Sequence, residues 1–167
     1  LFMSIFFIPW DIWFTFLKIW GFNPYYISGI YLFGLPLEEY LFFIFIPFCC
    51  IFTYHVVWTL SKNKSFDSFK KTSFLLSIIL FVFGIVFMNK LYSSFTFIGL
   101  SITLLIAPFY VNMRLFSKTF LILMFPFFIV NGILTGSFIE NEIVWYDNYN
   151  NLGIRLFTVP IEDIFYN

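Results

Sequence analysis

Residues 29–39 read GIYLFGLPLEE, and residues 153–163, which lie 124 positions later, read GIRLFTVPIED in the same register without a gap. Apolar matches arise easily in a chain this rich in Phe, Ile and Leu, so the weight lies on the shared glycine, proline and acidic pair. An acidic side chain costs roughly 2.5 to 3.5 kcal/mol at the centre of a membrane helix. An acidic pair that recurs at the start of two apolar segments therefore indicates a duplicated functional motif.

The composition around these motifs is that of a membrane protein. The chain has 167 residues, of which 61% are hydrophobic and 11% are charged, and its mean hydropathy is +0.93. Soluble proteins carry about 25% charged residues, so we predict an integral membrane protein. Nine basic and nine acidic residues cancel, which excludes the broad basic surface that binding to nucleic acid requires.

Long apolar runs predict an all-α fold, a polytopic bundle of transmembrane helices. A spanning helix needs about 20 residues. The run that ends near Ile8 and the run that opens at Pro160 are shorter than this, so we expect both to be helix fragments. Complete spans are expected at residues 36–60, 72–88, 95–111 and 119–135.

The charged residues are divided between the two sides of this bundle. Six of the nine basic residues lie in the connections 61–71 and 112–118, so the positive-inside rule places these connections in the cytoplasm. Eight of the nine acidic residues lie in segments 11–39 and 140–163, on the non-cytoplasmic side. Four spans separate the two motifs, and an even number of crossings returns the chain to the same face. The motifs are therefore expected to share one membrane surface.

The duplication predicts two parallel repeats related by a pseudo-two-fold axis along the membrane normal, an arrangement known in other membrane proteins. The first repeat covers residues 1–60 and contains a helix fragment, a loop and the helix that begins at the first motif. Residues 61–118 are expected to form connecting helices. The second repeat covers residues 119–167 and is expected to stop before the end of its last helix.

Each motif places a proline, an apolar residue and two acids at the start of an apolar helix. Proline is favoured at the first helical position, and acids in the first turn interact favourably with the helix dipole by about 0.3 to 1 kcal/mol. This structural role explains one acid per motif, whereas two acids in both motifs favour proton chemistry. Adjacent side chains are about 100° apart on a helix, so we expect one acid to point into the bundle and the other to face the loop. The candidate catalytic residues are Glu38, Glu39, Glu162 and Asp163.

The second motif differs from the first at Arg155, which replaces Tyr31. A cation close to Glu162 or Asp163 would lower the pKa of that carboxyl group, and the first motif has no equivalent cation. Carboxyl groups in different environments can divide the roles of acid and base. The two copies are therefore predicted to be chemically unequal.

Aromatic residues crowd the segments that flank both motifs. Their ordinary role is the aromatic belt at the membrane interface, but ring faces in a pocket would also stabilise a carbocation as they do other cations. An asparagine in the fifth apolar segment is expected either to pack that helix or to supply a hydrogen bond near the second motif. The candidate substrate-binding residues are Trp20, Phe22, Phe42, Asn131, Trp145, Tyr146 and Arg155.

Several cofactor motifs are absent from the sequence. There is no GxGxxG fingerprint, no P-loop and no cluster of His and Cys, so we expect neither a nucleotide cofactor nor a metal. An Asp-rich motif that would hold magnesium and diphosphate is also absent. The expected chemistry is proton transfer in an apolar chamber.

The two motifs resemble the acidic signature of the small membrane-bound lycopene cyclases, which occur as heterodimers in actinobacteria and as fused two-half proteins elsewhere. The first motif continues as PLEEYLFF from Pro36, and the second as PIEDIFY from Pro160. The resemblance covers most of the chain. Flanking stretches that look like the fused bacterial form are WD at 10–11, WGFNP at 20–24, FTY at 52–54, LTG at 134–136 and GIR at 153–155.

This resemblance implies an intramolecular lyase that converts the linear ends of lycopene into β-ionone rings, giving γ-carotene and then β-carotene with no net redox change. It implies a protein of the bacterial cytoplasmic membrane, with lycopene and the lipid bilayer as partners and no flavin. Because both halves are present in one chain, no heteromeric partner is required, and contact with other carotenoid enzymes is a further expectation. Two other functions stay open on the sequence: a small proton-coupled carrier, and a non-catalytic membrane subunit of a carotenoid enzyme complex.

Overall fold

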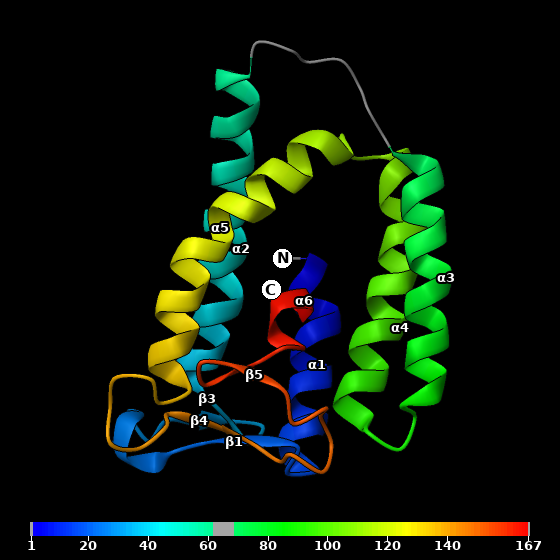
Figure 1. Ribbon diagram of the computed structural model, residues 1–167. Coiled ribbons are helices and arrows are strands. Elements are labelled where there is room, and N and C mark those ends of the chain that lie inside the picture. Colours follow the sequence, from blue (N-terminus) through cyan, green and yellow to red (C-terminus); the bar gives the residue numbers. More distant parts are fainter. Residues whose placement is uncertain (1, 62–68, 167) are drawn as a thin grey trace.

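The computed structural model describes residues 2–61 and 69–166, which form helices above a layer of short strands (Figure 1). The helices of this part of the chain are α1 (Phe2–Phe16), α2 (Leu37–Leu60), α3 (Lys70–Val86), α4 (Leu91–Ile106), α5 (Met113–Leu134) and α6 (Asp163–Tyr166), with 3-10 turns η1 (Pro24–Tyr26) and η2 (Ala107–Phe109). The strands are β1 (Trp20–Phe22), β2 (Tyr31–Leu32), β3 (Leu35–Pro36), β4 (Val144–Tyr146), β5 (Arg155–Leu156) and β6 (Val159–Pro160).

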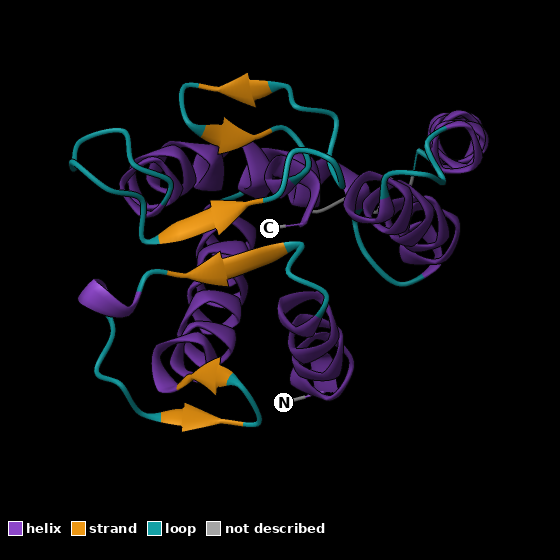
Figure 2. Cartoon of the chain, turned by 90° about the horizontal axis from the view of Figure 1, so that it is seen from below, coloured by secondary structure: helices purple, strands orange, loops and turns teal. Residues whose placement is uncertain are grey.

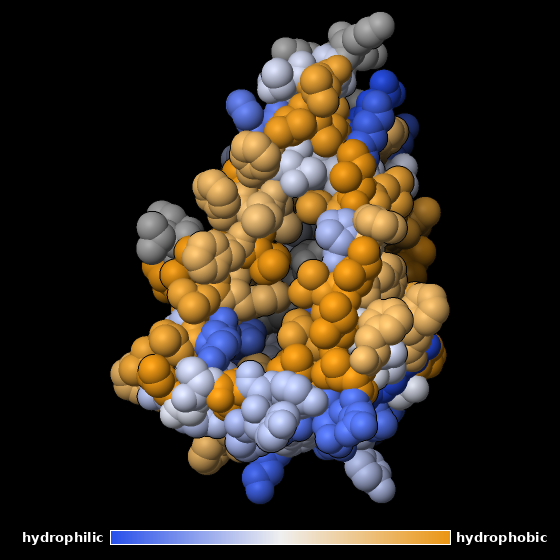
Figure 3. Space-filling view, turned by 90° about the vertical axis from the view of Figure 1, so that its left-hand side faces the viewer, coloured by the Kyte–Doolittle hydropathy of each residue, from blue (hydrophilic) through white to orange (hydrophobic). Residues whose placement is uncertain are grey.

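Three helices of the described residues are long and apolar enough to cross a membrane: α2 with 24 residues, α4 continued by η2 with 19, and α5 with 22. Helix α3 has 17 residues, which is the lower end of the roughly 17 to 25 that a membrane span uses. The four spans expected from the sequence therefore correspond to the three long helices and to the shorter helix α3. Figure 3 shows apolar side chains over the helices and hydrophilic ones at the two ends of the molecule. The protein is therefore an integral membrane protein.

The first helix is longer than the sequence predicted. We expected it to end near Ile8, but α1 continues through Pro9 to Phe16. A proline removes one backbone hydrogen bond, which apolar helices tolerate when neighbours and local adjustments compensate; α2 and α5 also contain an internal proline. Packing explains the continuation, because Phe14 on the last turn is completely buried.

The helices are arranged in two groups. Helices α2 and α5 contact each other on one side, α3 and α4 pack together on the other, and α1 and α6 lie between them (Figure 1). The contact between α3 and α4 uses small polar residues: the hydroxyl groups of Ser77 and Ser101 are 3.0 Å apart, and Ser94 Oγ donates to the carbonyl of Gly84 over 2.8 Å. Such residues allow close approach of membrane helices.

The strand layer contains three two-stranded antiparallel sheets, all at one end of the helices. In the central sheet β1 pairs with β4, so that Trp20 lies opposite Tyr146, Gly21 opposite Trp145 and Phe22 opposite Val144. One hairpin lies on each side of this pair (Figure 2). The sheet joins residues more than 120 positions apart and brings the segments that precede both acidic motifs together.

The two hairpins, β2–β3 and β5–β6, have matching backbone geometry. In each, the residue that follows the first strand has a left-handed φ, 51° at Phe33 and 58° at Phe157. In each, the residue after the motif proline donates a backbone hydrogen bond to a loop carbonyl, over 2.9 Å in the first copy and 3.0 Å in the second. The repeated sequence thus folds twice into the same local structure.

The central strand pair requires a glycine at position 21. A Cβ atom added to Gly21 would lie 2.3 Å from Cζ2 of Trp145 and 2.6 Å from Cε2, far inside van der Waals contact. We expect Gly21→Ala to lower the free energy of unfolding by about 1 to 3 kcal/mol, the usual cost of overpacking. Thermal unfolding in detergent measures this cost.

The matched control is Gly99→Ala on α4, because a Cβ there meets nothing within 4 Å. Alanine is a better helix former than glycine by roughly 0.5 to 1 kcal/mol, so this variant should be as stable as the parent or more so. Equal stability of the two variants would show that Trp145 moves aside without cost.

Candidate active site

The first acidic motif begins α2, and its two acids face different surroundings. Glu38 is exposed, and its Oε1 accepts a hydrogen bond from the backbone N–H of Ser28 over 2.7 Å. Glu39 is half-buried and shares a side-chain hydrogen bond with Asp11 of α1. The expectation that one acid faces the loop and the other points inward is therefore confirmed for this motif.

Asp11 is the buried partner that the first motif acquires in the fold. Its side chain is 1% exposed, and its Oδ1 accepts from the indole N–H of Trp20 over 2.6 Å and from the hydroxyl group of Thr15 over 3.3 Å. Burial raises the pKa of Asp11 to about 6, although the hydrogen bonds to Trp20, Glu39 and Thr15 lower it. A hydrogen bond between two carboxyl groups requires a proton on one of them, so Asp11 and Glu39 together hold a proton.

In the second motif Glu162 also bonds to the loop, since it accepts from the backbone N–H of Leu152, the counterpart of Ser28, so the expectation is confirmed there as well. Unlike in the first motif, both acids are buried. Glu162 is 0% exposed, and its Oε1 accepts from Ser93 Oγ over 2.5 Å and from the backbone N–H of Leu152 over 2.8 Å. Its Oε2 is buried and makes no hydrogen bond within the described residues. Both donors therefore converge on one oxygen of this carboxyl group.

Asp163 is held by two tyrosines. Its Oδ1 accepts from the hydroxyl group of Tyr92 over 2.5 Å, and its Oδ2 accepts from the hydroxyl group of Tyr146 over 2.9 Å. Burial raises the pKa of Asp163 to about 6. The two tyrosine hydrogen bonds oppose this effect, the charge of Glu162 adds to it, and the charge of Arg155 lowers the pKa most weakly. Asp163 lies outside the three long spanning helices.

The loop before the second motif places α4 against these acids. The carbonyl group of Asn150 accepts from the backbone N–H groups of Tyr92 over 2.9 Å and Ser93 over 3.4 Å. The ammonium group of Lys90 donates to the carbonyl group of Asn151 over 2.5 Å. These bonds satisfy N–H groups that a helix start leaves free, and they direct the Tyr92 and Ser93 side chains to Asp163 and Glu162.

An aromatic cluster connects the two motifs. The rings of Trp20 and Tyr92 pack edge to face with centroids 5.2 Å apart, and Tyr146 lies 6.2 Å from Trp20 and 5.9 Å from Tyr92. Trp20 also donates to Asp11, whereas both tyrosines donate to Asp163. The buried carboxyl groups of the two copies are thus linked through three contacting rings.

Three of the predicted substrate-binding residues belong to this cluster or lie beside it. Trp20 and Tyr146 are members, and Phe22 packs against the buried residues around them. Trp145 covers Gly21, and it lines a pocket of about 340 Å³ together with Phe22 and loop residues that include Glu142.

Arg155 is not a direct partner of either acid in the second motif. Its guanidinium group donates to the carbonyl of Thr158 over 2.7 Å and to the side chain of Asn148 over 3.0 Å. It lies 5.8 Å from the ring centroid of Tyr146. The Arg155 side chain therefore acts on Asp163 through its charge, which lowers the pKa of that carboxyl group as the sequence predicted, and not through a hydrogen bond.

The contacts of Phe42 and Asn131 are within their own helices. The ring of Phe42 contacts Phe43 on the same helix, with centroids 5.8 Å apart. The carbonyl group of Asn131 accepts from the hydroxyl group of Thr135 over 2.7 Å. Within the described residues, neither makes a hydrogen bond or ring contact with an acid of the two motifs.

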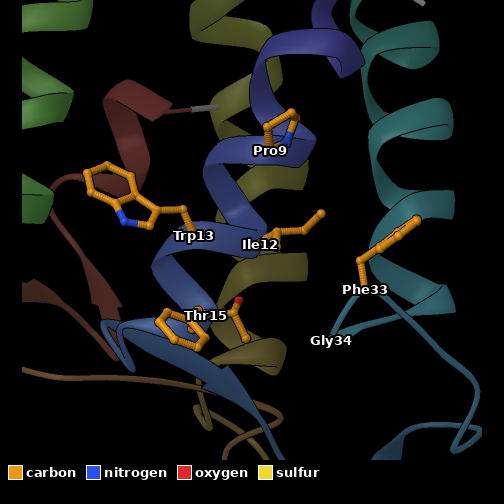
Figure 4. A pocket seen from close by; sticks show the side chains of 7 residues that line it. Pro9, Ile12, Trp13, Thr15, Phe33 and Gly34 are labelled. Carbon is orange, nitrogen blue, oxygen red and sulfur yellow. The ribbon is translucent and has the colours of Figure 1, made fainter.

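An apolar groove of about 450 Å³ runs beside the first acidic pair. Side chains of α1 form one wall, and the turn between β2 and β3 forms the other with Phe33 and Gly34 (Figure 4). Thr15 lines the groove and also donates to Asp11, so the groove ends next to a buried carboxyl group. Across the described part of the chain, no three His, Cys, Asp or Glu side chains gather closely enough to hold a metal ion.

Three residues of the site were not predicted from the sequence: Asp11, Tyr92 and Ser93. Tyr92 and Ser93 were overlooked because the fourth apolar segment was expected to begin at residue 95, whereas α4 begins at Leu91. A signal was present, since residues 92–94 read YSS at the start of an apolar run. Asp11 was assigned to a loop because α1 was expected to end before it.

Comparison with protein-family models matches residues 1–57 and 89–167 to the family described as lycopene cyclase. The matched segments contain both acidic motifs, Asp11, Trp20, Tyr92 and Tyr146. The unmatched residues 58–88 contain the end of α2 and all of α3. No curated protein and no solved structure matches the chain.

Proposed function

The chain belongs to the lycopene cyclase family, which makes it a membrane enzyme of carotenoid cyclisation, and we propose that its two acidic motifs perform the proton transfers of one active site. The observation that carries this proposal is the aromatic cluster of Trp20, Tyr92 and Tyr146, which touches Asp11 on one side and Asp163 on the other. Two separate sites would not require buried rings between them.

The reaction needs an acid, an apolar aromatic environment and a base. Protonation of the terminal double bond of lycopene leaves a tertiary cation, and a second double bond attacks this cation to close the ring. Loss of a ring proton to a base restores a double bond, so atoms and electrons balance without a redox partner. Positioned acids and bases typically contribute 10²- to 10⁴-fold each. Glu39, Glu162 and Asp163 are the proposed proton-transfer groups, and the products are β-ionone rings. Exposed Glu38 is proposed to hold the loop through Ser28.

The apolar groove beside α1 supplies a position for the substrate. Its walls are apolar and aromatic, with Trp13 and Phe33 among them, and Thr15 connects it to Asp11. We assign it to the linear polyene, with one end directed at the acids. An extended forty-carbon chain is about as long as the roughly 30 Å hydrocarbon core, so one end reacts at a time.

A pseudo-two-fold relation between residues 1–60 and residues 119–167 is the proposed basis of the single site, with residues 61–118 as the connection. With the offset of 124 positions, β1 in the first copy corresponds to β4 in the second. Exchanging the copies turns the Trp20–Tyr146 pair into the Phe22–Val144 pair, which is also present, and leaves the Gly21–Trp145 pair unchanged. The pairing of β1 with β4 therefore supports the relation. The matching hairpins support it as well. Such an axis brings both motifs to one place.

The acidic end of the molecule is proposed to face away from the cytoplasm. Lys70, Lys71, Arg114 and Lys118 are four of the six basic residues on which the positive-inside argument rests. The other two, Lys62 and Lys64, lie outside the described residues. The strand layer and both motifs are at one end of the helices in Figure 1.

Expression of the full-length gene in bacteria that accumulate lycopene tests the proposed function. We expect cyclised carotenoids and a colour change from red to yellow-orange, with γ-carotene preceding β-carotene in product analysis. Unchanged lycopene in the presence of folded protein would contradict the proposal and favour the carrier or the non-catalytic subunit. Glu140→Gln serves as a control, because Glu140 is an exposed acid outside both motifs and its loss should leave the products unchanged.

A further inference from the structure

The two acids of the second motif have hydrogen bonds of different kinds, and this difference assigns their roles. A protonated carboxyl group has one oxygen that carries the proton and one that only accepts, whereas an ionised group accepts at both. Glu162 receives both of its donors at Oε1, and its Oε2 is buried without a partner among the described residues. This is the pattern of a neutral acid whose proton is on Oε2.

Asp163 shows the opposite pattern. Its two oxygens each accept from a different hydroxyl group, Oδ1 from Tyr92 and Oδ2 from Tyr146. Each oxygen keeps a second lone pair, on which it can accept a proton from a ligand. Hydrogen bonds to the charged form of a carboxyl group favour that form, so the tyrosines keep Asp163 ionised although it is only 3% exposed.

We propose that Glu162 donates the proton that starts cyclisation and that Asp163 removes the ring proton that ends it. Tyr92 and Tyr146 are then positioning residues, because they act through Asp163. This assignment rests on the proposed function and adds to it the direction of proton flow in the second motif. In each cycle the O–H bond of Glu162 breaks as a C–H bond forms at the terminal double bond. A ring C–H bond then breaks, and its proton goes to Asp163.

The catalytic cycle closes without any other reactant. Cyclisation leaves Glu162 ionised and Asp163 protonated, so one proton must return from Asp163 to Glu162 before the next substrate reacts. The two groups are neighbours in the chain and interact electrostatically. Glu38 accepts from the loop in the same way as Glu162, but it is exposed, whereas Glu162 is buried and also accepts from Ser93.

The first test measures the pH dependence of cyclisation in permeabilised membranes. Burial raises the pKa of Asp163 to about 6, and a base must be ionised to act, so activity of the parent enzyme should fall as the pH drops below about 6. Tyr92→Phe removes a hydrogen bond that lowers this pKa, so the midpoint of the fall should move to higher pH by about one unit. Tyr146→Phe should act in the same direction.

The control for this test is Tyr149→Phe, because Tyr149 is 88% exposed and lies outside the site. Its midpoint should equal that of the parent. A Tyr92→Phe enzyme that loses activity equally at every pH would overturn the role of Tyr92, since a purely structural defect does not move the midpoint.

The second test follows deuterium from D₂O into the substrate. In Asp163→Asn, protonation by Glu162 still occurs but the ring proton cannot leave. The ring reopens, ionised Glu162 takes back a hydrogen from the carbon that it protonated, and deuterium accumulates at that carbon of the terminal double bond. In Glu162→Gln we expect neither rings nor deuterium. Deuterium in the Glu162→Gln lycopene, or its absence from the Asp163→Asn lycopene, would overturn the assignment. These outcomes leave the proposed function intact as long as the parent enzyme forms cyclised products, whereas a parent enzyme that forms none contradicts the function itself.

Discussion

Replacing Glu162 with Gln is expected to lower the rate of cyclisation by about 10²- to 10⁴-fold, the usual contribution of a positioned acid. Glutamine has the shape of glutamic acid and keeps an oxygen that can accept from Ser93 and Leu152, so the fold should persist. The proton at the second oxygen is lost. Product analysis of membranes that contain equal amounts of parent and variant protein measures the effect.

The matched comparison is Glu38→Gln, which is the same change at the equivalent position of the first motif. It shows whether the loss of cyclisation is specific to the second motif. Glu38 is exposed and accepts from the N–H group of Ser28, an interaction that a glutamine oxygen can also make. We expect a loss of less than about tenfold, below the range of a positioned acid. Equal losses in the two variants would mean that both copies contribute equally to the chemistry.

Asp11→Asn is expected to reduce cyclisation by about 10²-fold or more without unfolding the protein. Asn keeps an oxygen that accepts from Trp20, but the amide cannot share a carboxyl proton with Glu39. The loss follows if the Asp11–Glu39 pair takes part in returning the proton from Asp163 to Glu162. Activity and thermal unfolding of the same preparation measure the two quantities separately.

Two further variants separate chemistry from structure at Asp11. Asp11→Leu leaves the buried indole N–H of Trp20 without its carboxylate acceptor, which should cost about 1 to 3 kcal/mol of stability. Thr15→Val removes only the longer bond of 3.3 Å and should leave most of the activity. Full activity in Asp11→Asn would show that the Asp11–Glu39 pair is a structural contact.

Much of the fold follows from local sequence. Apolar segments of about 20 residues predict helices because backbone groups in lipid must bond within one segment, and α2 and α5 were found within a few residues of their expected positions, apart from an earlier start of α5 at Met113. The end of α1 was not predicted, because Pro9 normally ends a helix and only the buried packing of Phe14 shows why this one continues.

The candidate site was predicted only in part. The acids of the two motifs could be identified because a charged group at the start of an apolar helix is costly and these recur. Tyr92 and Asp11 could not be connected to them, because they are distant in the chain and belong to no repeated pattern. The charge of Arg155 lowers the pKa of Asp163 as expected, but its guanidinium group bonds to the turn carbonyl of Thr158 and the side chain of Asn148.

The sequence by itself determined that this is a helical membrane protein with a duplicated acidic motif, because hydropathy and repetition are properties of the chain alone. Only the tertiary structure decided how the acids differ. Glu162 and Asp163 are adjacent in sequence, yet one takes both donors on a single oxygen and the other is held between two tyrosines. The protonation of a buried carboxyl group depends on the donors that surround it. Those donors come from α4, from β4 and from the loop at Leu152, which meet at the motif only when the chain folds.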